Sequence, residues 1–186
     1  MIKRVVCLIL LVLIFMMIPT NIGASSHPLP SGRLNGEELA MEYAQECQIS
    51  VERAKIILSI DLSDSKARTY RILSEKIIVN PNYEVRVKFY CRTDESGQFR
   101  GITKLLAASL VNKDGDKEAP FTGNLFAYLE DPNRVFYIVS GEFYHKGSNK
   151  EQLYQREGGR MLEVIYDFVD DTSTGFPVFL ETKLRF

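Results

Sequence analysis

The chain has 186 residues, and its 23 basic and 24 acidic side chains give a formal net charge of −1. A chain of this length accommodates one domain with a core of its own. The balanced charge excludes the strongly basic surface that nucleic-acid-binding domains carry, and no block of basic residues predicts binding to anionic lipid.

Residues 1–24 have the layout of a secretory signal peptide. Lys3 and Arg4 precede an apolar run from Val5 to Ile18, and the small residue Ala24 offers a cleavage site. The apolar run is shorter than the about 20 residues that a membrane-spanning helix needs. We therefore expect a secreted protein with no stable membrane span after cleavage. The alternative is that this segment is retained as an N-terminal anchor.

Residues 25–35 are rich in proline and serine, which predicts a linker before a single folded domain of residues 36–186. A helix is predicted over Glu37–Gln48, because apolar residues recur at helical spacing on one face. They are Leu39, Ala40, Tyr43, Ala44 and Cys47. Ser50 is placed to cap a second short helix to about Leu58, although this stretch also alternates in a way that permits a strand.

The clearest strand signal is Tyr83–Arg92. Its apolar residues alternate with mostly charged ones at the period of two that puts one set in the core and the other in water. Residues 68–79 fit a helix or a strand, and a strand is favoured because β-branched residues cluster at its end. Further strands are predicted over residues 99–111, 125–130, 135–144, 152–157, 160–169 and 178–186.

This order of elements predicts an α+β domain. One or two N-terminal helices would pack on a curved antiparallel meander sheet of seven or eight strands. The alternative is an eight-stranded up-and-down barrel with a helix outside it. In the last hairpin, a two-residue turn at Gly158–Gly159 would place Glu157 opposite Arg160 and Gln155 opposite Leu162. The face of this hairpin that is expected in the core consists of Leu162, Val164, Tyr166 and Phe168.

Two cysteines remain once Cys7 leaves with the signal peptide, which gives an even pair in an exported chain. Cys47 lies on the apolar face of the predicted helix, and Cys91 lies on the apolar face of the strand that begins at Tyr83. If these faces pack together, both sulfurs enter one interface, so we expect a Cys47–Cys91 disulfide. The alternative is two buried free thiols.

The hairpin of residues 125–144 is apolar on both faces. One set of side chains is Leu125, Leu129, Val135, Tyr137 and Val139, and the other is Phe126, Tyr128, Phe136 and Ile138. One face can pack on the core. The second is either covered when the sheet folds over or left as an apolar surface that binds something. The candidate binding residues are Phe126, Tyr128, Phe136 and Tyr144.

Patterns of catalysis and metal binding are weak. Cys91 and His145 could act as nucleophile and base only if the fold brought them together. Glu163 and Asp167 would lie about 13 Å apart on one strand, which is too far for a glycosidase pair. Residues 112–116 resemble the start of a calcium loop but lack the glycine and the glutamate that complete one. No pattern predicts a metal or a cofactor.

Two functional hypotheses follow. The first is an exported, non-catalytic binding or interaction module whose partner is a protein or a small apolar ligand. The poverty of catalytic groups favours it over an enzyme. The second is a small extracellular hydrolase that uses carboxylates or a Cys–His pair. Convergence of His145 or of two acids in one concave pocket would distinguish them.

Overall fold

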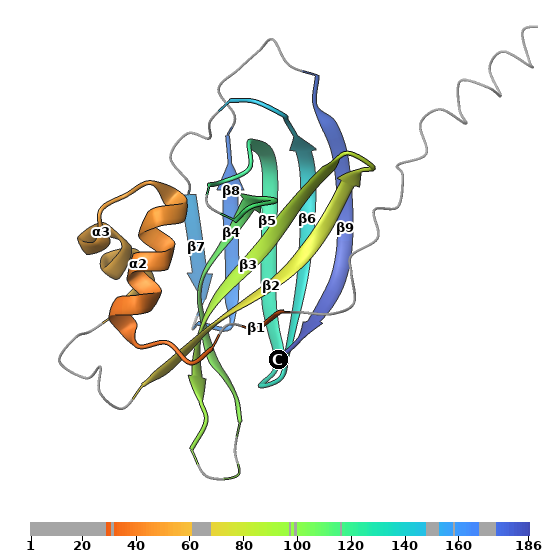
Figure 1. Cartoon of the computed structure of the whole chain (residues 1–186). Helices are drawn as coiled ribbons and strands as arrows, with labels where there is room; N and C mark the ends of the chain where they lie inside the picture. The colour runs from red at the N-terminus through yellow and green to blue at the C-terminus, as the bar shows by residue number, and fades with distance from the viewer. Residues whose placement is uncertain are drawn as a thin grey trace, which may run out of the picture.

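The computed structural model describes residues 29–30, 32–60, 68–96, 98, 100–115, 117–147, 153–157, 159–167 and 174–186. Across these residues, two helices and two antiparallel sheets form three layers, with the four-stranded sheet in the middle (Figure 1). The described strands do not close into a barrel. The predicted α+β class is therefore confirmed, and the alternative barrel is not formed.

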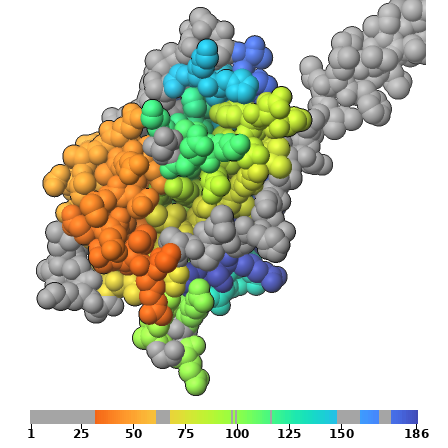
Figure 2. Space-filling model, viewed as in Figure 1, coloured from red at the N-terminus to blue at the C-terminus, as the bar shows by residue number. Residues whose placement is uncertain are grey.

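The helical layer consists of α2 (Gly36–Cys47), which the sequence predicted, and α3 (Val51–Leu58), for which the sequence permitted either a helix or a strand. The Asn35 side chain accepts a hydrogen bond from the Glu38 amide, and the Glu38 carboxylate accepts one from the Asn35 amide. This reciprocal pair fixes the start of α2. Ser50 caps α3 as predicted. Both helices lie together as one orange mass beside the yellow-green surface of the strands in Figure 2.

The four-stranded sheet has the order β1-β2-β3-β4, with β1 Leu29–Pro30, β2 Thr69–Asn80, β3 Tyr83–Asp94 and β4 Gly101–Asn112. The five-stranded sheet has the order β7-β8-β5-β6-β9, with β5 Phe121–Asp131, β6 Arg134–Phe143, β7 Leu153–Glu157, β8 Met161–Tyr166 and β9 Phe176–Arg185. β2, β3 and β4 keep the predicted meander order. The β5–β6 hairpin lies at the centre of its sheet, because the chain returns to both of its sides.

β3 is buried on both faces over part of its length. The side chains that point between the two sheets are Val85, Val87, Phe89 and Cys91, as the alternation predicted. Tyr90 was expected to face water, but it is fully buried beneath the helices. Its ring packs edge-on against Tyr43, with 4.8 Å between the ring centroids. The alternation predicted that the Tyr90 side chain faces solvent. This pattern describes the strand alone and does not show that the helices cover that face of the sheet.

The predicted Cys47–Cys91 disulfide is wrong, because both residues are free cysteines. Cys91 belongs to the cluster between the sheets, whereas Cys47 packs in the helical layer on the other face of the four-stranded sheet. The prediction placed α2 on the apolar face of β3, but the five-stranded sheet occupies that face. The middle sheet therefore separates the two sulfurs, and burial raises the pKa of both thiols.

The predicted register of the β7–β8 hairpin is wrong by one residue. Glu157 pairs with Met161 and not with Arg160, and Gln155 pairs with Glu163. The connection is therefore one residue longer than the two-residue turn that the glycine pair favoured.

The predicted core face of β8 is confirmed for Leu162, Val164 and Tyr166, which are buried. The Tyr166 hydroxyl also accepts a hydrogen bond of 3.2 Å from the Leu110 amide, which links the two sheets. Phe168 and the expected signal peptide of residues 1–24 lie outside the described residues. Within the described part of the chain, no helix is long and apolar enough to cross a membrane.

Candidate functional site

The β5–β6 hairpin has one buried and one part-exposed face. The side chains that lie between the sheets are Leu125, Leu129, Val135, Tyr137 and Val139. On the opposite face, Phe126 pairs with Ile138 and Tyr128 pairs with Phe136. These four side chains are part-exposed, and the exposed fraction of Tyr128 is 38%. Both helices pack on the other sheet, so they do not cover this face.

The neighbouring strands extend this surface, which we call the outer face, to a width of four strands. The pairing registers arrange its side chains in three rows. The Tyr128 row is Met161, Tyr128, Phe136 and Lys183; the Phe126 row is Glu163, Phe126, Ile138 and Glu181; the Phe179 row is Ile165, Asn124, Ser140 and Phe179. Ile165 is 38% exposed and Phe179 is 52% exposed. In the Tyr128 and Phe126 rows the central pairs are therefore apolar, with charged residues on β9 in both rows and on β8 in the Phe126 row. The Phe179 row has polar residues in its centre and apolar ones on β8 and β9.

Two cations flank the aromatic rings of the Tyr128 row. The Lys183 ammonium lies 6.0 Å from the centre of the Phe136 ring and 2.7 Å from Glu130 Oε1. The Arg160 guanidinium lies 5.7 Å from the centre of the Tyr128 ring. A cation over an aromatic face contributes about 0.5–1 kcal/mol at exposed sites. The Tyr128 row thus has a cation near each end, of which Lys183 is paired with Glu130, whereas the Phe126 row ends in two glutamates.

Tyr144, the fourth predicted binding residue, lies away from the other three. It follows the end of β6, eight residues beyond Phe136, which is about 26 Å along an extended strand. Its hydroxyl donates to Glu142 at 3.0 Å, and its carbonyl accepts from the Tyr83 hydroxyl at 2.8 Å. The structure therefore brings together the first three predicted residues and places Tyr144 outside that group.

Cys91 and His145 do not form a nucleophile–base pair. His145 is exposed and stacks between Tyr83 and Phe176, with ring-centroid distances of 4.6 Å and 4.8 Å. Cys91 is fully buried, and its thiol donates to the Phe89 carbonyl at 3.7 Å. Burial raises the pKa of the Cys91 thiol, which favours the protonated, unreactive form.

The segment that resembles the start of a calcium loop is a turn. The Asn112 side chain accepts a hydrogen bond of 2.9 Å from the Gly115 amide, as the Asp-Gly turn signal predicted. Among the described residues, no group of three or more histidine, cysteine, aspartate or glutamate residues could hold a metal ion.

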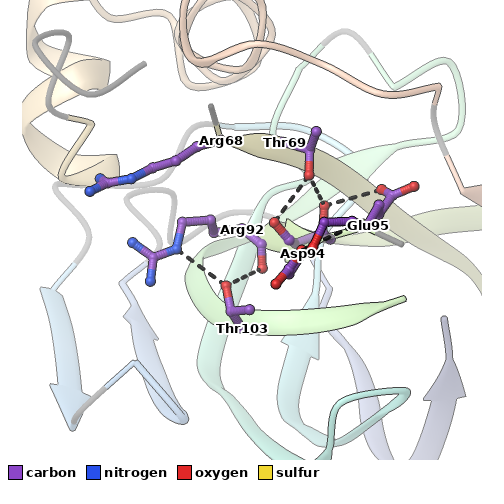
Figure 3. Close-up of a pocket in the computed structure, with 8 residues that line it drawn as sticks. Arg68, Thr69, Arg92, Asp94, Glu95 and Thr103 are labelled. Atoms are coloured by element: carbon purple, nitrogen blue, oxygen red, sulfur yellow. Dashed lines mark hydrogen bonds between the residues drawn. The ribbon is translucent and has the colours of Figure 1, made fainter. Parts of the chain in front are cut away.

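A polar pocket of about 500 Å³ lies at the ends of β2, β3 and β4 (Figure 3). It is lined by Arg68, Thr69, Arg92, Thr93, Asp94, Glu95, Ser96 and Thr103. Arg68 and Arg92 extend their guanidinium groups toward the same side in Figure 3. Sequence reasoning missed this pocket, because its residues come from three separate segments and match no motif.

Internal pairing accounts for much of the polar lining of this pocket. Arg71 donates to both carboxylate oxygens of Glu95 at 2.8 Å, and Arg33 donates to one of them at 2.9 Å. These hydrogen bonds, led by those from Arg71, lower the pKa of Glu95 to about 2. Arg92 donates to the Thr103 hydroxyl at 3.2 Å. The cluster ties β2 to the end of β3 and to the segment that precedes α2.

Two glutamates, Glu46 and Glu75, are buried in the interior, and no pattern in the sequence predicted the burial of either. Glu46 of α2 is 2% exposed and contacts the Lys88 ammonium and the Tyr90 hydroxyl. Glu75 of β2 is 5% exposed and accepts a hydrogen bond of 2.9 Å from the Tyr137 hydroxyl. Burial raises the pKa of both carboxyl groups. Such buried polar contacts hold layers together and need no ligand to explain them.

The raised pKa of Glu75 predicts a dependence of stability on pH. The folded state holds the Glu75 proton more tightly than the unfolded chain does, so stability decreases as pH rises from the ordinary glutamate pKa toward the folded-state value. We expect Glu75→Gln, which keeps a polar partner for Tyr137 without the charge, to flatten this decrease and to stabilise the protein above neutral pH.

Urea unfolding of wild type and variant across mildly acidic to mildly alkaline pH measures this effect. Glu46 titrates in both proteins, so the difference between the two curves isolates Glu75. Glu52→Gln, at an exposed position of α3, is the matched control and should leave the curve unchanged. Parallel curves for wild type and Glu75→Gln would show that Glu75 is not the titrating group.

No model of a known protein family matches this chain, and no curated protein or solved structure matches it either. Function is therefore inferred from the side chains themselves. Of the sites described, the outer face presents apolar surface to solvent. In the pocket at the ends of β2, β3 and β4, Glu95 bonds to Arg71 and Arg33, and Arg92 and Asp94 bond to the hydroxyl groups of Thr103 and Ser96.

Proposed function

We propose that the protein is an exported, non-catalytic interaction module that binds a protein partner through the outer face. The observation that supports this most directly is the pairing of Phe126 with Ile138 and of Tyr128 with Phe136 on a face that remains part-exposed. Covering such surface releases about 25 cal/mol per Å² of apolar area. The signal-peptide layout of residues 1–24 supports export.

The shape of the outer face favours a protein over a small apolar ligand. Small ligands bind in concave sites that bury most of their surface, whereas these side chains stand on one face of a sheet. Protein interfaces combine a centre rich in aromatic residues with a polar rim. The outer face has that arrangement, with Phe126, Tyr128 and Phe136 in the centre and charged residues on β8 and β9.

The hydrolase hypothesis receives no comparable support. Cys91 lies between the sheets, whereas His145 is exposed. The acidic residues that approach a concave site, Asp94 and Glu95, hydrogen-bond to Ser96, Arg71 and Arg33.

Site-specific photo-crosslinking tests the proposal. A photoreactive phenylalanine analogue at Phe136 should give a crosslinked protein species when the chain is produced with its own leader and exported. The same analogue at Asp114, which is exposed in the turn after β4, should not. Equal crosslinking at the two positions, or none at Phe136, would overturn the proposal. The intact mass of the exported chain reports cleavage after Ala24 in the same experiment.

A further inference from the structure

We infer that the protein partner at the outer face is a second copy of this chain, related by a two-fold axis that crosses the strands between the Tyr128 row and the Phe126 row. This rests on the proposed function, because it names the partner of the same surface. It is carried by the charge pattern of the outer face, which is complementary to itself in one orientation.

Symmetry leaves two simple ways to pack this face against itself. A two-fold axis must lie in the plane between the two sheets, because each copy presents the same surface. An axis along the strands would place each row on the same row of the other copy, with β8 opposite β9. Glu163 would then face Glu181, and Arg160 would approach Lys183. Like charges would meet on both rows, which opposes this orientation.

An axis across the strands gives the opposite result. Each strand then lies antiparallel to its own copy, and the Tyr128 row of one copy lies on the Phe126 row of the other. Lys183 faces Glu181 on β9, and the Arg160 guanidinium, which lies near the Tyr128 ring, approaches Glu163 on β8. Because the interface is symmetric, each of these opposite-charge contacts occurs twice.

The apolar centre fits the same orientation. Tyr128 of one copy lies over Phe126 of the other, and Phe136 lies over Ile138, so each aromatic side chain of the Tyr128 row meets an apolar one. One step further out, Arg185 comes to lie opposite Phe179, the most exposed of the large apolar residues on this face. A guanidinium over an aromatic ring is a favourable contact.

The size of the outer face predicts a weak, reversible dimer. The three rows, together with the row of Arg134 and Arg185 beyond the Tyr128 row, make four rows about 6.7 Å apart on four strands about 4.8 Å apart, which gives about 500 Å² per copy. The total of about 1,000 Å² lies at the lower limit for specific interfaces. We therefore expect dimerisation to depend on protein concentration in the micromolar range.

Sedimentation velocity over protein concentrations from about 1 µM to about 1 mM tests the inference. Wild type should shift from monomer to dimer. Lys183→Glu and Glu181→Lys should each weaken dimerisation at least about tenfold, because each puts like charges together twice. The double variant restores the pairing with its sign reversed, so it should dimerise within about threefold of wild type. Lys113→Glu, in the exposed turn after β4, is the matched control and should behave as wild type.

Lys183→Glu also removes the ion pair with Glu130, so urea unfolding of each monomer should accompany the measurement. If a single substitution weakened dimerisation only by unfolding the monomer, the second substitution would not restore dimerisation. Recovery of the dimer in the double variant therefore excludes loss of folding as the cause. A wild type that stays monomeric, a dimer that no substitution on the outer face affects, or a double variant no better than the single ones would overturn the inference. A monomeric wild type whose Phe136 crosslinks a different protein would overturn the dimer and leave the proposed function standing. Absence of any crosslink at Phe136 would overturn both.

Discussion

Val164→Asp is expected to leave the chain unfolded. Val164 is fully buried between the two sheets and pairs with Leu125 across β5. An aspartate there would bury a carboxyl group among apolar side chains, at a cost of several kcal/mol. That cost is comparable with the total stability of about 5–15 kcal/mol of a typical domain. Circular dichroism and urea unfolding of the purified variant measure the loss.

Glu163→Lys is the matched control for this substitution. Glu163 is the neighbouring residue on β8, and its side chain lies on the outer face. A charge reversal at such a position usually changes stability by about 0.5 kcal/mol or less, when measured at concentrations where the chain is monomeric. Equal losses from the two substitutions would mean that the buried face of β8 is assigned to the wrong residues.

Glu46→Ala is expected to reduce stability by about 3–5 kcal/mol, because it breaks a buried ion pair and leaves one partner uncompensated. Glu46 joins α2 to the middle sheet through the Lys88 ammonium and the Tyr90 hydroxyl, and Ser109 Oγ lies 3.3 Å from the same carboxylate. Without it, the fully buried Tyr90 hydroxyl keeps Ser109 Oγ at 3.3 Å, and the largely buried Lys88 ammonium keeps the Gly115 carbonyl at 3.3 Å, which does not balance its charge. Urea unfolding measures the change.

The double variant Glu46→Ala/Lys88→Met separates the loss of the pair from the cost of an unpaired charge. If the ammonium causes most of the damage, the double variant should be more stable than Glu46→Ala by at least about 1 kcal/mol. Glu42→Ala, an exposed position on the same helix, should cost about 0.5 kcal/mol or less. Tolerance of Glu46→Ala at the level of Glu42→Ala would mean that α2 is held to the sheet by apolar contacts alone.

Local periodicity and capping signals predicted most elements, but they did not predict what covers each of them. The helical face of α2 and the alternation of β3 were correct as local statements. Tyr90 and Cys91 show where such reasoning ends, because they are adjacent residues that enter different layers. Which layer covers which face of β3 depends on contacts between distant segments. The disulfide prediction was wrong because the sequence does not show that the five-stranded sheet, and not α2, covers the apolar face of β3.

The candidate site shows the same division. Phe126, Tyr128 and Phe136 could be grouped from the sequence, because a short turn fixes the register of the two strands that it joins. Tyr144 was included on strand alternation alone, which does not measure distance along the strand. The buried pairs of Glu46 and Glu75 join residues on different elements, and no local pattern indicates such contacts.

The central position of the β5–β6 hairpin determines when the five-stranded sheet can form during synthesis. β6 acquires its second neighbour only when β9 has been made, and β9 also supplies Leu180 and Leu184 to the cluster between the sheets. Because contacts between distant segments carry a large loop-closure entropy, such topologies fold slowly. The apolar side chains of β5 and β6 therefore remain accessible to solvent or to other chains until late in synthesis.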